Sequence, residues 1–287
     1  MRYFRTARGG EPHLVADDKT GAYDLTATAG GPNSLVELFR AGALTDKSVD
    51  EVASTHLEDA PRIDLDGASL ELPVRPGEVW AAGVTYRISE EAREEESGEP
   101  DVYVDVYDSE RPEVFFKATP SRTVGPGEAV GVRGDSDWDV PEPELGVVLY
   151  GGEVAGFTVG NDVSSRAIEG ENPLYLPQAK VYDRCCALGP CVASPETVPD
   201  PHDLELSMAI RRDGDVVFDD STSTDRMVRT CEELASYVTR HNRVPETTVV
   251  LTGTALVPES EFTLRPGDEV EIHLEDVGTL RNSVVRV

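Results

Sequence analysis

Three acidic residues, Glu142, Glu144 and Asp162, have the types and spacing that most directly suggest chemistry. The two glutamates stand two positions apart and lead into an apolar run, so they share one face of an expected strand. Carboxylates held close together repel one another unless a cation lies between them. Hard divalent ions take oxygen ligands of this kind, which points to Mg²⁺, with Mn²⁺ or Ca²⁺ as alternatives. Taken alone, the E-P-E triplet is better interpreted as an acidic strand end on an acid-rich chain, and only the flanking sequence favours the functional interpretation.

The net charge limits the partners of this chain. Its 287 residues include 55 Asp and Glu against 26 Lys and Arg, a formal net charge of −29. Dispersed acids with very few lysines are typical of a protein that stays soluble in molar salt, so we interpret the charge as a halophilic habitat. An acidic nucleic-acid mimic is the alternative, but the acids are mixed with regular apolar periodicity. Binding to nucleic acid itself is disfavoured, because phosphates would be repelled.

Lysine is scarce enough to carry information. The chain has only Lys19, Lys47, Lys117 and Lys180, and the last two lie in its motif-rich middle. We therefore expect Lys117 and Lys180 to serve chemistry rather than solubility.

Other composition signals point to the cytoplasm. No apolar run is long enough to cross a bilayer, and the first residues lack the apolar region of a signal peptide, so no membrane association is expected. The cysteines form no C-x-x-C pair and have no histidine cluster beside them, which disfavours zinc and favours buried thiols. They are Cys185, Cys186, Cys191 and Cys231.

The residues that could do chemistry must be positioned by a mainly β fold with some α (α+β). The breaker-rich segment 73–77 divides a small N-terminal domain, residues 1–75, from a catalytic domain, residues 76–287. The N-terminal domain is expected to contain strands at 2–7 and 13–16 and a helix at 34–40, capped by Asn33 or Ser34. Further strands are expected at 79–82, 114–117, 145–150, 154–159, 207–211, 249–252 and 269–274.

Turns and helices complete this prediction. Gly151-Gly152 indicates a hairpin between two strands. Helices are expected at 163–169 and 224–239. The acidic stretch 89–101 is expected to form a solvated helix or a flap.

An ordered set of motifs resembles the fumarylacetoacetate hydrolase superfamily. This resemblance implies a mixed β-roll C-terminal domain and a small N-terminal α/β domain. Two segments, 111–117 and 171–178, are similar to the branch of 2-keto-3-deoxy-D-arabinonate dehydratases within it. The motifs are W-A-A-G-V-T-Y at 80–86, F-F-K-A-T-P at 115–120, the E-P-E strand, G-N-D-V-S-S-R at 160–166, Q-A-K at 178–180 and T-G-T-A at 252–255.

The resemblance also implies roles for individual residues. The family's metal-binding carboxylates fall on Glu142, Glu144 and Asp162, and its active-site lysine falls on Lys180. Arg166, one helical turn beyond Asp162, would orient a metal-bound carboxylate, with a surface ion pair as the alternative. The residues that would line the substrate cleft, each with packing or a turn as its plainer role, are Thr85, Tyr86, Lys117, Thr119, Gly253 and Thr254.

One departure from the family pattern separates two reaction types. The hydrolases of the superfamily place a histidine, paired with a glutamate, after the G-x-x-Y motif to activate water. Here the corresponding segment, residues 87–100, has no histidine. Without a base of suitable pKa near the metal, water attack is poorly served, and a lyase is favoured. The five histidines are His13, His56, His202, His241 and His273.

The implied reaction is the dehydration of 2-keto-3-deoxy-D-pentonate, from D-xylonate or D-arabinonate, to 2,5-dioxopentanoate. A cation that holds the α-keto acid would acidify the C3 hydrogens, and hydroxide would then leave C4. Lys180 is expected to transfer the C3 proton or to polarise the enolate, with a pKa lowered by the nearby cation. Glu113 is the candidate to protonate the leaving hydroxyl, although an ordinary acid is nearly as good an interpretation. A Schiff base at Lys180 is the less simple route.

Two competing functions remain at this point. One is a hydrolase or decarboxylase that acts on an acylpyruvate, a diketo acid or oxaloacetate through the same enolate. The other is a sugar-acid-binding module without activity, against which the intact set of carboxylates and Lys180 argues. The resemblance alone implies a homodimer or homotetramer.

Overall fold

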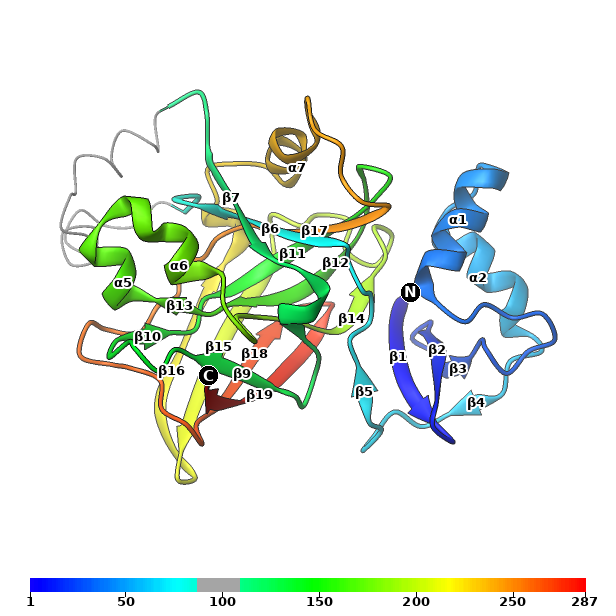
Figure 1. Ribbon diagram of the computed structural model, residues 1–287. Helices are drawn as coiled ribbons and strands as arrows, with labels where there is room; N and C mark the ends of the chain where they lie inside the picture. Colours follow the sequence, from blue (N-terminus) through cyan, green and yellow to red (C-terminus); the bar gives the residue numbers. More distant parts are fainter. Residues whose placement is uncertain (87–108) are drawn as a thin grey trace.

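Strands account for most of the regular structure in the computed structural model, which describes residues 1–86 and 109–287. They form two main sheets that pack face to face, with helices at the periphery (Figure 1). The expected predominance of strand over helix is confirmed. The expected acidic helix or flap at 89–101 lies outside the described residues.

The larger sheet runs through the whole molecule in the order β4-β3-β2-β1-β14-β12-β11-β17-β6-β7, and β5 and β8 attach beside it. Neighbouring strands are antiparallel except for β17 with β6 and β14 with β8. The strands are β1 (Arg2–Arg8), β2 (Glu11–Asp17), β3 (Ala22–Asp24), β4 (Arg62–Ile63), β5 (Leu70–Glu71), β6 (Glu78–Gly83), β7 (Glu113–Ala118), β8 (Thr123–Val124), β11 (Pro143–Tyr150), β12 (Glu153–Asp162), β14 (Cys186–Ala193) and β17 (Thr247–Leu251).

The second sheet packs against one face of the first. Its order is β16-β15-β18-β19-β9, and a separate two-stranded ribbon joins β10 to β13. Side chains such as Leu145 and Val147 of β11 and Leu206 and Met208 of β15 fill the space between the sheets. The strands are β9 (Ala129–Val132), β10 (Asp139–Val140), β13 (Ser164–Ser165), β15 (Glu205–Arg212), β16 (Asp215–Ser223), β18 (Glu269–Leu274) and β19 (Gly278–Arg286).

Short helices complete the fold. Ser34 occupies the N-cap position of the first helix, as predicted, and Ser48 forms a capping box with Glu51 at the second. No described helix combines the length and apolarity needed to span a membrane. The helices are α1 (Leu35–Thr45), α2 (Val49–Leu57), α5 (Arg166–Glu171), α6 (Leu176–Lys180) and α7 (Cys231–Thr239), with 3₁₀ turns η1 (Pro120–Arg122), η2 (Pro173–Tyr175) and η3 (Thr224–Arg226).

The N-terminal segment forms a distinct lobe in Figure 1 but continues the large sheet. Strand β1 pairs with β14, with Tyr3 opposite Val192. Helices α1 and α2 cover the face of the sheet that points away from the second sheet, where Leu38 belongs to the same apolar cluster as Val148 and Leu188. The division at residue 75 stays a prediction.

The sequence located strands better than helices. The expected strands and the Gly151-Gly152 hairpin turn are present. The prediction of one helix at 224–239 is wrong, because a 3₁₀ turn ends at Arg226 and α7 begins only after its N-cap Thr230. The helix predicted from residue 163 begins at Arg166, because Ser164 and Ser165 pair as a strand with β10. Helix α2 was not predicted.

The two-stranded ribbon of β10 and β13 contains a buried acid. Asp139 of β10 is 3% exposed, and its Oδ1 has no hydrogen-bond partner among the described residues. Burial raises the pKa of Asp139 to about 6, because a charged carboxylate loses its hydration there. The folded protein therefore binds a proton more tightly at Asp139 than the unfolded chain does. Its contribution to stability is full below the unfolded pKa and is lost as pH rises through about 6.

We predict that Asp139→Asn removes the loss of stability that ionisation of Asp139 causes at higher pH. The change in the free energy of unfolding caused by the substitution should be more favourable at pH 7.5 than at pH 4 by on the order of 2 kcal/mol. Denaturant titrations at constant high salt measure the difference. Asp219→Asn, an exposed acid on β16, is the control and should shift stability equally at both pH values. The same pH independence in Asp139→Asn would contradict the prediction.

Candidate metal centre and active site

The structure brings the three acids together on one face of the large sheet. Glu144 pairs across β11 and β12 with Gly160, and the Asp162 amide donates to the Glu142 carbonyl over 2.9 Å. This register places Asp162 beside Glu142, and one carboxylate oxygen from each acid lies within 4.8 Å of the others. All three side chains are buried.

Glu144 is the acid whose charged form is disfavoured by its surroundings. Its Oε2 accepts a hydrogen bond of 2.6 Å from the Gly253 amide, which follows β17. Burial, together with the charges of Asp162 and Glu142, raises the pKa of Glu144 well above its usual range. A cation bound beside Glu144 would stabilise its charged form and so counteract the raised pKa.

Lys180, the last residue of α6, enters the cluster from the other side. Its Nζ donates to Glu142 Oε2 at 2.7 Å and to Ser164 Oγ at 2.6 Å, and it lies 3.4 Å from Asp162 Oδ2. Burial opposes its charge, but Asp162 and Glu142 outweigh burial and raise the pKa of Lys180. A nearby cation was expected to lower the pKa of Lys180. The protein groups by themselves raise it instead.

Lys117 of β7 is the second ammonium of the cluster. Its side chain is fully buried, and its Nζ lies 2.5 Å from Asp162 Oδ1. It also donates to the carbonyls of Val163 and Lys180, at 2.9 and 2.6 Å. Burial works against its charge, and Asp162 overcomes this and raises the pKa of Lys117.

Arg166, the first residue of α5, lies against Glu142. Its Nη2 is 3.1 Å from Glu142 Oε1, and its Nη1 is 4.0 Å from Glu169 Oε2. Although burial raises the pKa of Glu142, the charges of Lys180 and Arg166 more than reverse this and lower it. This contact agrees with the role expected for Arg166 rather than with a surface ion pair.

The residues fit a hard divalent cation. Three buried carboxylates offer oxygen donors, the type that Mg²⁺, Mn²⁺ and Ca²⁺ prefer. The neighbouring cations neutralise Glu142 and Asp162, whereas the direct partner of Glu144 among residues 1–86 and 109–287 is an amide. Glu142, Glu144 and Asp162 would hold the ion.

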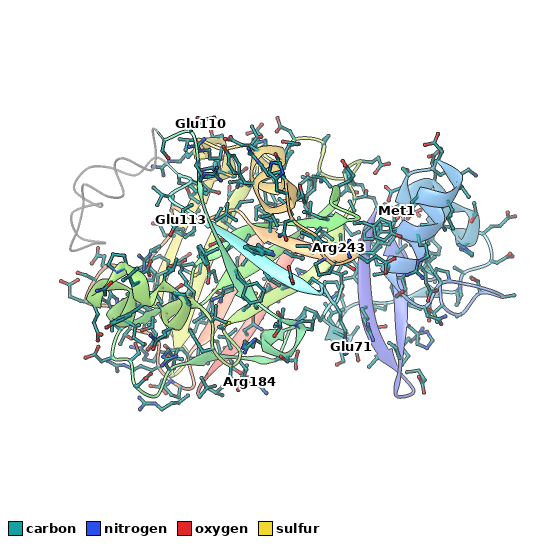
Figure 2. All side chains as sticks on the ribbon, turned by 45° about the horizontal axis from the view of Figure 1, so that its top comes forward. Met1, Glu71, Glu110, Glu113, Arg184 and Arg243 are labelled. Carbon is teal, nitrogen blue, oxygen red and sulfur yellow. The ribbon has the colours of Figure 1, made fainter. Side chains whose placement is uncertain are left out.

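Glu113 lies on the same face of β7 as Phe115, because alternate strand residues share a side. Figure 2 shows Glu113 far from Met1, where the N-terminal lobe begins. Its carboxylate covers Gly83, where an added Cβ would lie 2.0 Å from Glu113 Oε2. Burial and the charge of Glu169 raise the pKa of Glu113. A carboxyl that keeps its proton near this cluster can act as an acid.

The other expected site residues differ in how closely they approach the cluster. The Tyr86 hydroxyl is buried without a hydrogen-bond partner in the described part of the chain, and burial and the charge of Glu144 raise the Tyr86 pKa. Thr85 donates to the Thr252 carbonyl at 2.5 Å, beside Gly253. Thr254 accepts from the Leu256 amide within its turn.

Thr119 stands apart from this group. Its hydroxyl bonds with Ser121 at 2.9 Å and accepts from Arg122 Nη1 at 3.0 Å, at the start of η1. The structure therefore occupies Thr119 with its own turn, and no contact with the carboxylates is seen for it.

Sequence reasoning missed several residues of the site. Ser164 bonds Lys180 directly, and Phe115 has its ring centroid 5.5 Å from Lys180 Nζ. Glu169 Oε2 is buried with no hydrogen bond within the described ranges. Ser164 and Phe115 lie inside recognised motifs, whereas only the i,i+3 spacing from Arg166 could have indicated Glu169.

Comparisons with known proteins identify the family of this chain. The family model described as fumarylacetoacetate (FAA) hydrolase, C-terminal, matches residues 78–285, beginning close to the predicted domain boundary. The chain belongs to the fumarylacetoacetate hydrolase family. The resemblance seen in the sequence is thereby confirmed.

Particular relatives are dehydratases. The chain is 60% identical, over 100% of both chains, to a probable 2-keto-3-deoxyxylonate dehydratase of Haloferax volcanii. It is 46% identical, over 72% of each, to 2-dehydro-3-deoxy-D-arabinonate dehydratase of Saccharolobus solfataricus. A solved structure of 2-keto-3-deoxy-D-arabinonate dehydratase complexed with magnesium and 2,5-dioxopentanoate matches with a TM-score of 0.86 and 35% identity, covering 100% of this chain and 99% of the other.

Gly253 gives the first prediction for the site. Its φ is +84°, and an added Cβ would lie 2.2 Å from Thr85 Oγ1 and 2.8 Å from the Ala82 carbonyl. Gly253→Ala should therefore displace the amide that holds Glu144, weaken Mn²⁺ binding several-fold, and destabilise the fold by about 2 kcal/mol through strain and crowding. Isothermal titration with Mn²⁺ and denaturant titration measure both effects.

Gly214→Ala is the matched control. Gly214 has a φ of +89° but nothing within 4 Å of an added Cβ. It carries the same backbone strain without crowding or contact with the site, so Mn²⁺ binding should not change. Equal Mn²⁺ affinity in both variants would refute the role given to the Gly253 amide.

Proposed function

We propose that this protein is a metal-dependent dehydratase that converts 2-keto-3-deoxy-D-pentonate to 2,5-dioxopentanoate and water. The observation that carries the proposal is the convergence of three buried carboxylates, the Lys180 ammonium and the raised-pKa acid Glu113. The dehydratase relatives support it, one of them solved with magnesium and the same product. When bound, Mg²⁺ supplies Lewis-acid withdrawal of charge from the oxygens of an α-keto acid.

Lys180 stabilises negative charge on the substrate. Asp162 and Glu142 keep its ammonium protonated, and Ser164 fixes its direction. A protonated lysine opposes the base role, so of the two roles expected for Lys180, polarisation of the enolate fits the geometry better. Its charge favours loss of a C3 proton by lowering the energy of the enolate.

Glu113 supplies the proton that the leaving group needs. Loss of a C3 proton to water and departure of the C4 hydroxyl, protonated by Glu113, as water create a double bond between C3 and C4. Isomerisation moves one hydrogen from C5 to C3 to give an enol, and transfer of the enol hydroxyl hydrogen to C4 then yields the C5 aldehyde. Burial keeps Glu113 protonated at higher pH than an exposed glutamate, as a general acid requires.

The surrounding groups favour elimination over hydrolysis. The cations that contact the carboxylates in the described ranges are Lys117, Lys180 and Arg166, all groups that stabilise charge rather than activate water. The buried Tyr86 hydroxyl and the turn at Gly253-Thr254 are the proposed contacts for the polar end of the substrate. Thr85 would shape the same wall.

Three further features complete the proposal. Mg²⁺ is the proposed native metal. The protein acts in the cytoplasm of a salt-adapted cell, which its net charge of −29 supports. It works as a homodimer or homotetramer in oxidative pentose degradation, an assembly that family resemblance supports.

Activity and metal binding should be lost together. The assay incubates the protein with 2-keto-3-deoxy-D-pentonate and Mg²⁺ in high salt, and a coupled dehydrogenase reports the semialdehyde through reduction of NAD(P)⁺. Glu142→Ala and Asp162→Ala should each lower turnover at least ~1000-fold, since several kcal/mol of charge stabilisation are lost. Titration with Mn²⁺ should show no site in either variant.

Glu153→Ala is the control, because Glu153 is an exposed acid at the start of β12. It should leave turnover and Mn²⁺ binding unchanged. A wild-type protein that consumes the substrate equally well after exhaustive chelation would disprove the proposed function.

Glu113→Gln tests the acid. The amide keeps the shape but cannot donate a carboxyl proton, so kcat should fall about a hundredfold or more while KM changes little. Wild-type kcat should decline as pH rises through the raised pKa of Glu113, and the variant should lose this limb. Glu110→Gln, at an exposed position just before β7, should behave like wild type. An unchanged pH profile in Glu113→Gln would assign the acid elsewhere.

A further inference from the structure

The Lys117 ammonium is surrounded by protein groups. Its Nζ donates hydrogen bonds to the Val163 and Lys180 carbonyls at 2.9 and 2.6 Å, and it forms an ion pair with Asp162 Oδ1 at 2.5 Å. The side chain is 0% exposed. A substrate could contact this amine only by displacing one of these three groups.

We propose that Lys117 is a positioning residue, which orients Asp162 for the metal and holds the backbone of Lys180, rather than a contact of the substrate. This assignment replaces the cleft-lining role expected from the sequence. It rests on the proposed metal-dependent function, but it concerns the ion-binding step alone.

The two oxygens of Asp162 show how the orientation works. Lys117 takes Oδ1 at 2.5 Å, whereas Lys180 lies at a looser 3.4 Å from Oδ2. The tighter contact fixes the rotation of the carboxylate and leaves Oδ2 turned toward Lys180. Second-layer contacts of this kind set the geometry of metal ligands.

The same ammonium links three segments that carry the site. Lys117 belongs to β7, Val163 directly follows β12, and Lys180 ends α6. The carbonyl of Lys180 is held by Lys117 while its own Nζ reaches Glu142 and Ser164. Lys117 therefore fixes the backbone position from which the Lys180 side chain extends.

Tyr182 contacts both Lys117 and the Val163 carbonyl that Lys117 bonds. Its hydroxyl donates to the same Val163 carbonyl at 2.9 Å, and its ring centroid lies 5.7 Å from Lys117 Nζ. The surroundings of Lys117 thus consist of a carboxylate, two carbonyls and an aromatic face. They form a structural cation site rather than an open wall of a cleft.

The first test uses Lys117→Met, which keeps the length and removes the charge. Mn²⁺ binding, followed by electron paramagnetic resonance, should weaken tenfold or more, in the range typical of lost second-layer contacts. In the coupled assay at saturating Mn²⁺, kcat should fall while KM for the keto acid stays within about twofold. Lys47→Met, at an exposed lysine of the N-terminal lobe, is the control and should match wild type.

Unchanged Mn²⁺ affinity with a raised KM would overturn the proposal in favour of a substrate contact. A wild-type protein that binds no Mn²⁺ would also overturn it. Wild type that binds Mn²⁺ but dehydrates nothing would sink the proposed function, whereas loss of Mn²⁺ affinity in Lys117→Met would still support the positioning role.

A second measurement needs no variant and so covers misfolding of Lys117→Met. The chain has only four lysines, so reductive methylation with formaldehyde and cyanoborohydride, read by peptide mass spectrometry, resolves each one. The exposed Lys19 and Lys47 should be labelled, and Lys117 should stay unmodified. Labelling of Lys117 in the native protein would overturn the proposal.

Discussion

Three carboxyl groups buried side by side are the constraint around which this protein is organised. Removing a carboxylate from water costs several kcal/mol unless charge or hydrogen bonds compensate it. Here Lys117, Lys180 and Arg166 compensate Asp162 and Glu142, but in the described part of the chain the direct partner of Glu144 is a backbone amide. The uneven compensation leaves the cluster suited to one more cation, which is what a metal centre for keto-acid chemistry requires.

The fold serves this cluster by bringing distant segments to one place. The antiparallel register of β11 and β12 sets Asp162 beside Glu142, and the turn after β17 supplies the Gly253 amide. Strand β7 supplies both Glu113 and Lys117. The opposite face of the large sheet packs on the second sheet, so one rigid scaffold supports both the core and the site.

The sequence predicted the strands well because alternating apolar residues between glycines and prolines leave little ambiguity. Its errors fell where tertiary contacts override a local pattern. Residues 164–165 fit a helix by composition but pair with β10, and the helix predicted from 224 is interrupted before Thr230. Helix α2 depends on the capping box at Ser48 and on packing of Val52 and Ala53, a short signal that the sequence did not make conspicuous.

By itself, the sequence determined which residue types the chemistry would use: the acids at 142, 144 and 162, the two rare central lysines, and the family motifs that order them. Only the tertiary structure decided how they divide the work. Lys117 and Lys180 look alike in the sequence, yet Lys117 bonds two backbone carbonyls and pairs with Asp162, whereas Lys180 directs its ammonium at the side chains of Glu142 and Ser164. The charge state of Lys180 and the proton affinity of Glu113 likewise depend on burial and on neighbours distant in the chain, because electrostatic energies follow spatial separation rather than sequence position.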